Sequence, residues 1–185
     1  MARTASNMLP IGTQAPNFNL FDTIAESKKN LNEIKGVKGT VITFICNHCP
    51  FVIHINDKLV SVANEYQKFG IGFVAISSND VNNYPQDGPN EMKLQALKLG
   101  YPFPYLYDET QDVAKSYDAA CTPDFFVFDS ELKLVYRGQF DDSRPENNIN
   151  VDGKDLKNAL NCLITNTSNN QIQKPSIGCN IKWKN

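Results

Sequence analysis

The chain has 185 residues, of which 21% are charged and 41% hydrophobic, and its formal net charge is −2. This length suits one domain with a full core, so we expect a single domain over residues 1–185, with a lead-in over about 1–12 and a linker and tail over about 165–185. The sequence contains no Lys/Arg cluster, so neither nucleic acid nor an anionic membrane is indicated as a partner. No apolar run resembles a signal peptide or a membrane span, so we expect a cytoplasmic protein.

The first elements lead towards a pair of cysteines. Residues 15–20 alternate apolar and polar positions, which predicts a short strand, and residues 31–34 predict one helical turn ended by Gly36. Gly39 separates this turn from residues 41–45, a β-branched and aromatic run typical of a buried strand. That strand ends at Cys46.

The middle of the chain predicts a strand–helix–strand unit. From residue 50, apolar positions at helical spacing predict a long helix that Gly70 ends, and residues 71–77 predict another buried strand. The right-handed crossover rule makes the two strands parallel. The turn that carries the cysteines then lies at the carboxyl end of the sheet, where α/β proteins place their sites.

The second half predicts shorter elements. A polar loop over 79–87 precedes a helix over 90–99 ended by Gly100, a short strand over 104–107 and a helix over 111–117. Residues 125–128 and 132–136 predict a hairpin. A helical period over 155–164 predicts the last helix.

Cys46 and Cys49 are separated by two residues at a strand-to-helix turn. A helix that begins at about Asn47 directs its positive end at the Cys46 sulfur, which favours the thiolate, and a protonated His48 adds a second favourable charge. We therefore predict Cys46 as the nucleophile and Cys49 as the resolving thiol, with Pro50 in the first helical turn.

A cysteine pair at this spacing is also compatible with half of a zinc site or with two inert core thiols. Five cysteines is an odd number in this chain, which argues against a secreted disulfide framework. A structural zinc site needs about four ligands, and no second closely spaced pair exists among the remaining candidates, Cys121, Cys162, Cys179 and His54. We expect no metal and no organic cofactor.

Two motifs, CNHCP at 46–50 and TPDFFVFD at 122–129, complete a resemblance to the thioredoxin fold. It implies an α/β protein whose central mixed sheet is flanked by helices, with an N-terminal strand extension and a C-terminal tail. It also implies that the Thr122–Pro123 bond is cis and that the Thr122 backbone lies beside the sulfurs. The APNFNL start resembles the AhpC/TSA (redoxin) and TlpA/ResA branch, and PSIGCNIKWK, FICNHCPF and YRGQFDDSRP resemble bacterial "thioredoxin family" proteins within it.

The chain departs from these families at several positions. Ile45 stands where thioredoxins usually have Trp, and Thr40 where they have a buried carboxylate, so the base for Cys49 is not identified. Peroxiredoxins place Pro and Thr ahead of their reactive cysteine; Thr43 matches, but Gly39 occupies the Pro position. No arginine lies just before Thr122, which weakens a peroxidase reaction.

The expected activity is thiol–disulfide exchange with a protein disulfide substrate and a thiol reductant, in a monomer or a homodimer. A thiol peroxidase with an antioxidant role is the second hypothesis, and a non-catalytic thiol or metal-binding module that uses Cys46, Cys49 and Cys121 is the third. The expected site consists of Cys46, Asn47, His48, Cys49, Thr122 and Pro123. Cys121, two residues before Pro123, and Cys179, in a tail able to fold back, are further redox candidates.

Overall fold

A seven-stranded mixed sheet forms the centre of the computed structural model, which describes residues 3–184. Its strands are β2 (Asn19–Asp22), β3 (Ser27–Asn30), β4 (Gly39–Phe44), β5 (Ile71–Ser77), β6 (Tyr105–Tyr107), β8 (Asp124–Asp129) and β9 (Leu134–Gly138). They lie in the order β3-β2-β6-β5-β4-β8-β9. The predicted parallel pairing of β4 with β5 is confirmed, and β8 runs antiparallel to β4.

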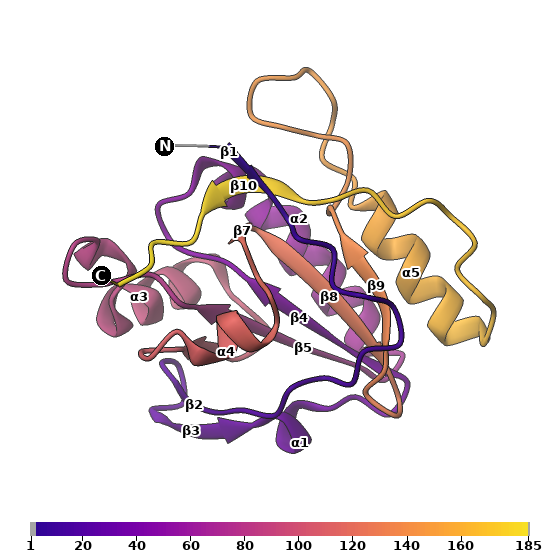
Figure 1. The fold of residues 1–185 in the computed structure, drawn as a ribbon, viewed down its shortest axis with the longest axis horizontal. Helices are drawn as coiled ribbons and strands as arrows, with labels where there is room; N and C mark the ends of the chain where they lie inside the picture. Colours follow the sequence, from indigo (N-terminus) through magenta and orange to yellow (C-terminus); the bar gives the residue numbers. More distant parts are fainter. Residues whose placement is uncertain (1–2, 185) are drawn as a thin grey trace.

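A small second sheet joins the two ends of the chain. It contains β1 (Arg3–Ala5), β10 (Ile177–Asn180) and β7 (Cys121–Thr122), in the order β1-β10-β7. Figure 1 shows β10, in yellow, lying beside the indigo β1 near the start of the long helix. The expectation of a loose lead-in is therefore wrong for residues 3–5, and the expected tail contains a strand at residues 177–180; residues 1–2 and 185 lie outside the described part.

The helices cover both faces of the large sheet (Figure 1). They are α1 (Leu31–Ile34), α2 (Pro50–Gln67), the 3₁₀ turn η1 (Pro85–Asp87), α3 (Pro89–Leu99), α4 (Asp112–Ser116) and α5 (Lys154–Thr165). α2 ends as predicted just before Gly70 (φ +83°), and α3 ends at Gly100 (φ +65°), at backbone angles that glycine adopts without strain. Within residues 3–184, no helix combines the length and apolar character that crossing a membrane requires.

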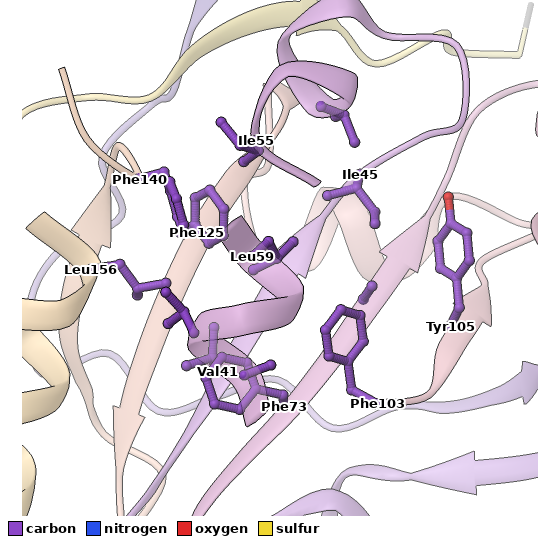
Figure 2. Packing of buried hydrophobic residues seen from close by; sticks show 14 of the residues in the cluster. Val41, Ile45, Ile55, Leu59, Phe73, Phe103, Tyr105, Phe125, Phe140 and Leu156 are labelled. Carbon is purple, nitrogen blue, oxygen red and sulfur yellow. The ribbon is translucent and has the colours of Figure 1, made fainter. Parts of the chain in front are cut away.

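Alternation along the strands divides the core into two clusters. Val41, Phe73 and Phe125 pack under α2 and α5, whereas their neighbours Ile42 and Phe126 face the opposite cluster. Figure 2 shows the first cluster, in which Ile55 and Leu59 of α2 lie over Val41 and Phe125 of the sheet. Each large side chain buried in this way contributes roughly 1.5–3 kcal/mol, so the face under α2 is a stable base for the turn that precedes it.

The strand expected over residues 15–20 is placed wrongly. β2 begins only at Asn19, and the preceding residues form no regular strand. Ala15 and Phe18 are apolar because they pack into the second core cluster, while the Ala15 N–H donates to the Leu132 carbonyl. The same alternation can therefore come from a loop that lies on a core.

Candidate active site

Cys46, Asn47, His48 and Cys49 form the turn between β4, which ends at Phe44, and α2, which begins at Pro50. The prediction that the helix begins at about Asn47 is wrong, because Cys49 is the residue that caps α2 and Pro50 occupies its first turn. The positive end of α2 therefore lies at Cys49 rather than at Cys46. This difference reverses the electrostatic argument for the two sulfurs.

Thr122, on β7 of the small sheet, contacts both sulfurs. Its Oγ1 lies 3.5 Å from Cys46 Sγ, and its carbonyl accepts a hydrogen bond of 3.1 Å from Cys49 Sγ. The Thr122–Pro123 peptide bond is cis, as the resemblance implied. Cys46 and Cys49 are almost fully buried, with exposures of 1% and 0%, so access to either sulfur needs local opening of the site.

The two sulfurs hold their protons with unequal strength. The hydrogen bond from Cys46 is the largest effect that lowers the pKa of Cys49, to about 5, and Cys179, Thr122 and the backbone of Val52 add to it against the opposing effect of burial. The same bond to Cys49 raises the pKa of Cys46, together with burial and the negative charge of Asp87. Burial and the Asp87 carboxylate therefore act against the lowered pKa that the sequence predicted for Cys46.

Asp87 is a site residue that the sequence patterns did not reveal. Its carboxylate, which is fully buried, lies 2.7 Å from His48 Nδ1 and accepts hydrogen bonds from the Asn47 backbone and the Asn79 side chain. Asp87 belongs to η1, in a stretch expected to be a polar loop. No local motif marks it, because its partners lie 8 to 40 residues away in sequence.

Asn47 and His48 are fixed by several further contacts. The Asn47 side chain donates to the Gln86 carbonyl and accepts from the Tyr105 hydroxyl. The His48 ring stacks on Tyr84, with ring centroids 5.5 Å apart, and its Nδ1 lies 4.0 Å from Cys46 Sγ. Both residues were predicted as site residues, and the structure brings both to the cysteine turn.

Three ligand atoms in this turn are close enough to hold a metal ion. Cys46 Sγ, His48 Nδ1 and a carboxylate oxygen of Asp87 all lie within 4.8 Å of one another. The sequence hypothesis of a metal-binding module used Cys46, Cys49 and Cys121 instead. The Cys121 thiol donates to the Pro123 carbonyl, at 3.6 Å, and burial raises its pKa, so Cys121 behaves as a core thiol.

Cys179, in contrast, reaches the pair. Its sulfur lies 2.9 Å from Cys49 Sγ, and burial together with the hydrogen bond to Cys49 raises the pKa of Cys179 to about 12. All five cysteines are thiols in this structure. The tail, which the sequence analysis described as able to fold back, brings Cys179 to the pair through the pairing of β10 with β7.

The sequence profile of the AhpC/TSA family matches residues 11–137 of this chain. A search of curated proteins finds no match. Among solved structures, an uncharacterized conserved protein from Geobacillus kaustophilus is 56% identical, with a TM-score of 0.98 over 100% of this chain and 97% of that one. A hypothetical protein from Sinorhizobium meliloti 1021 is 44% identical, with a TM-score of 0.95 over 98% of both chains.

A more distant solved structure shares the fold. The thioredoxin domain of a thiol-disulfide oxidoreductase from Bacteroides vulgatus is 18% identical, with a TM-score of 0.62 over 80% of this chain and 96% of that one. This similarity shows a shared fold, and the predicted thioredoxin-like architecture is confirmed. Because the family profile also covers more than half of the sequence, the chain belongs to the AhpC/TSA family of thioredoxin-like proteins.

Proposed function

We propose that the protein catalyses thiol–disulfide exchange with protein partners through Cys46 and Cys49. The observation that carries this proposal is the geometry of the pair, in which the Thr122 hydroxyl lies 3.5 Å from Cys46 Sγ and the Thr122 carbonyl accepts a hydrogen bond of 3.1 Å from Cys49 Sγ. A thiolate is the form that attacks a disulfide, so a pair that stabilises one negative charge is prepared for exchange at neutral pH. Membership of a redoxin family supports oxidoreductase chemistry at this pair.

Cys46 is the sulfur that meets the partner in this mechanism. It lies beside the partly exposed His48, whereas Cys49 lies between Thr122 and Cys179, which are both buried. As Cys46 attacks, its proton passes to the Cys49 sulfur, which lies 3.1 Å from the Thr122 carbonyl. Cys49 in this way acts as the base for Cys46.

The electrons and protons of the exchange balance without a cofactor. Cys46 sulfur attacks one sulfur of the partner's disulfide, a mixed disulfide forms, and the other partner sulfur departs and takes the proton held on Cys49. Cys49 thiolate then attacks Cys46 sulfur and releases the second partner sulfur as a thiolate. The partner disulfide is reduced by two electrons, the pair is oxidised to a disulfide, and an external thiol reductant returns the pair to its starting state.

A trapping experiment tests this proposal. Reduced Cys49→Ser protein, incubated with insulin as a model protein disulfide, is expected to accumulate a mixed disulfide through Cys46, because the resolving sulfur is absent. Intact-mass measurement after acid quenching detects the adduct. Cys162→Ser, which removes a partly exposed thiol on α5, is the matched control and should reduce insulin at the wild-type rate. Wild-type protein that fails to reduce insulin, with no adduct on Cys49→Ser, refutes the proposal.

The peroxidase hypothesis receives less support from the site. The Thr43 hydroxyl donates to the Asp124 carbonyl at 3.0 Å, and the side chains of Arg137 and Arg144 donate to polar groups away from Cys46. Peroxide reduction needs donors aimed at the reacting oxygens. Thiol loss from the reduced protein should therefore be slower with hydrogen peroxide than with an equal concentration of insulin disulfide, and the reverse order favours a peroxidase.

A further inference from the structure

A close contact between two sulfurs joins Cys49 and Cys179, at 2.9 Å. A disulfide bond has an S–S length of about 2.05 Å, so a shift of about 1 Å brings these sulfurs to bonding distance. Cys179 is also the least buried of the three sulfur-bearing residues at the site, with an exposure of 4%, against 1% for Cys46 and 0% for Cys49.

The fold fixes Cys179 at this position. Cys179 is the strand partner of Thr122 in the small sheet, and Thr122 is the residue that contacts both other sulfurs. Its neighbour Gly178 lies so close to Thr122 that an added Cβ would come within 1.9 Å of the Thr122 carbonyl oxygen. A glycine at 178 is therefore what allows β10 to approach the site.

Anchors on both sides of β10 hold the strand in place. Before it, the Ser176 backbone N–H donates to the Ser6 hydroxyl at 2.9 Å. After it, the Lys182 carbonyl accepts from the Asp80 backbone at 2.8 Å and from the Gln111 side chain at 2.8 Å. A strand tied at both ends presents its cysteine to Cys49 in a defined geometry.

We propose that Cys179 is a third redox-active cysteine, which exchanges with an oxidised Cys46–Cys49 pair to form a Cys49–Cys179 disulfide. This inference rests on the proposed function, because exchange with a partner is what first oxidises the pair. Cys179 sulfur attacks Cys49 sulfur, the Cys46–Cys49 bond breaks, and Cys46 leaves as a thiolate that takes the Cys179 proton. One disulfide is present before and after the step, so no oxidant or reductant is needed.

The exchange changes what the protein presents to its partners. The disulfide then includes Cys179 of the C-terminal strand in place of Cys46 of the turn. Cys46 becomes a thiol again beside His48. The new bond also ties β10 covalently to the start of α2. Oxidised protein is thus a mixture of two disulfide isomers, and Cys179 sets their proportion.

Disulfide mapping of the full-length protein tests this inference. A Cys46→Ser/Cys162→Ser protein is oxidised with glutathione disulfide, alkylated under denaturing acid conditions and digested with trypsin. Position 162 is replaced in every variant because residues 158–182 form one tryptic peptide that would otherwise carry two cysteines. We expect a cross-link between this peptide and the peptide 39–58, with the loss of two thiols per chain. The Cys46→Ser/Cys121→Ser/Cys162→Ser protein should give the same cross-link.

Two outcomes overturn the inference. One is Cys46→Ser/Cys162→Ser protein that ends as a Cys49–glutathione adduct with Cys179 alkylated. The other is Cys162→Ser protein in which oxidation yields only the bond between Cys46 and Cys49. Neither result affects the proposed function, which fails separately if wild-type protein does not reduce insulin. Circular dichroism of each variant confirms that the fold is retained before mapping.

Discussion

At the level of single residues, the site depends on where one negative charge is placed. Cys49 receives the hydrogen bond from Cys46 and lies at the N-terminus of α2, both of which favour its thiolate. Cys46 faces the Asp87 carboxylate, which disfavours a second negative charge nearby. The separation of roles between the two sulfurs therefore comes first from the hydrogen bond between them and from burial, to which the buried Asp87 carboxylate adds.

Removing the charge of Asp87 should make Cys46 a stronger acid. In a Cys49→Ser background, Asp87→Asn is expected to lower the pH midpoint of Cys46 alkylation by iodoacetamide by about 0.5–1 unit, since a buried negative charge close to a thiol raises its pKa. Glu91→Gln is the matched control, because Glu91 borders the surface pocket beside His48 and is exposed. An unchanged midpoint in Asp87→Asn would show that Asp87 only positions the turn.

Spacing along the chain singled out the cysteine turn, the family resemblance added Thr122 and Pro123, and Cys179 was named only as a further redox candidate. Cys46, His48 and Cys49 lie within four positions, so spacing and a strand-to-helix turn are enough to single them out. Asp87 and Cys179 are brought in by tertiary structure, 40 and 130 residues from their partners. A carboxylate in a polar loop and a cysteine in a polar tail carry no pattern that shows where they will lie.

At the level of elements, the position of the α2 terminus decides the chemistry. Asn47 and His48 are held in a bend by Asp87, Gln86 and Tyr84, so the helix starts after them at Pro50. The observed start of α2 differs from the predicted start by three residues, which does not change the fold. It does change the chemistry, because the positive end of the helix lies at Cys49 instead of Cys46.

The β10 strand should be sensitive to a single added methyl group. Gly178→Ala is expected to destabilise the protein by roughly 1–3 kcal/mol, because its Cβ would overlap the Thr122 carbonyl and push β10 away from β7. Gly88→Ala, where φ is −68° and the nearest atom to an added Cβ is 3.2 Å away, should stay within about 1 kcal/mol of wild type. Urea unfolding of the reduced proteins measures both. Equal stabilities would mean that β10 adjusts without cost.

Elements with strong periodic patterns were predicted well, and short polar strands were not. α2, α3, α5 and β5 follow apolar periods or runs that burial imposes, and their observed bounds differ from the expected ones by three residues or fewer. β1, β3 and β10 contain few buried side chains and exist because a neighbouring strand supplies hydrogen bonds. These strands form because a partner strand supplies hydrogen bonds, so their own sequences do not predict them.

At the level of the whole molecule, the two core clusters hold the cysteine turn and the C-terminal strand against each other. Parallel pairing of β4 and β5 under α2 follows from the sequence pattern, and it fixes the edge of the sheet at which the turn emerges. The return of the C-terminus to that same edge depends on contacts spread from Ser6 to Gln111. Because the site joins both ends of the chain, its protonation is coupled to the stability of the entire fold.

The reduced protein should therefore become less stable as the pH falls from about 8 to 5. Between the ordinary thiol pKa and about 5, the unfolded chain binds a proton at Cys49 that the folded chain does not, so the free energy of unfolding rises with pH across this interval. Above the ordinary thiol pKa the sign reverses. The folded protein then keeps protons on Cys46 and Cys179 that the unfolded chain has lost.

Urea unfolding under a phosphine reductant measures this dependence, with Cys49→Ser as the reference protein. The stability of wild type relative to Cys49→Ser is expected to decrease by on the order of 2–3 kcal/mol between pH 8 and pH 5.5, since each unit of pKa difference corresponds to about 1.4 kcal/mol. Thiolate absorbance near 240 nm should already be present across this interval in folded wild type, fall as the pH drops through about 5, and be absent in the variant. If the stabilities of wild type and Cys49→Ser change in parallel across this range, the thiolate lies on another sulfur. Direct titration of Cys46 and Cys49 would then identify which sulfur carries the charge.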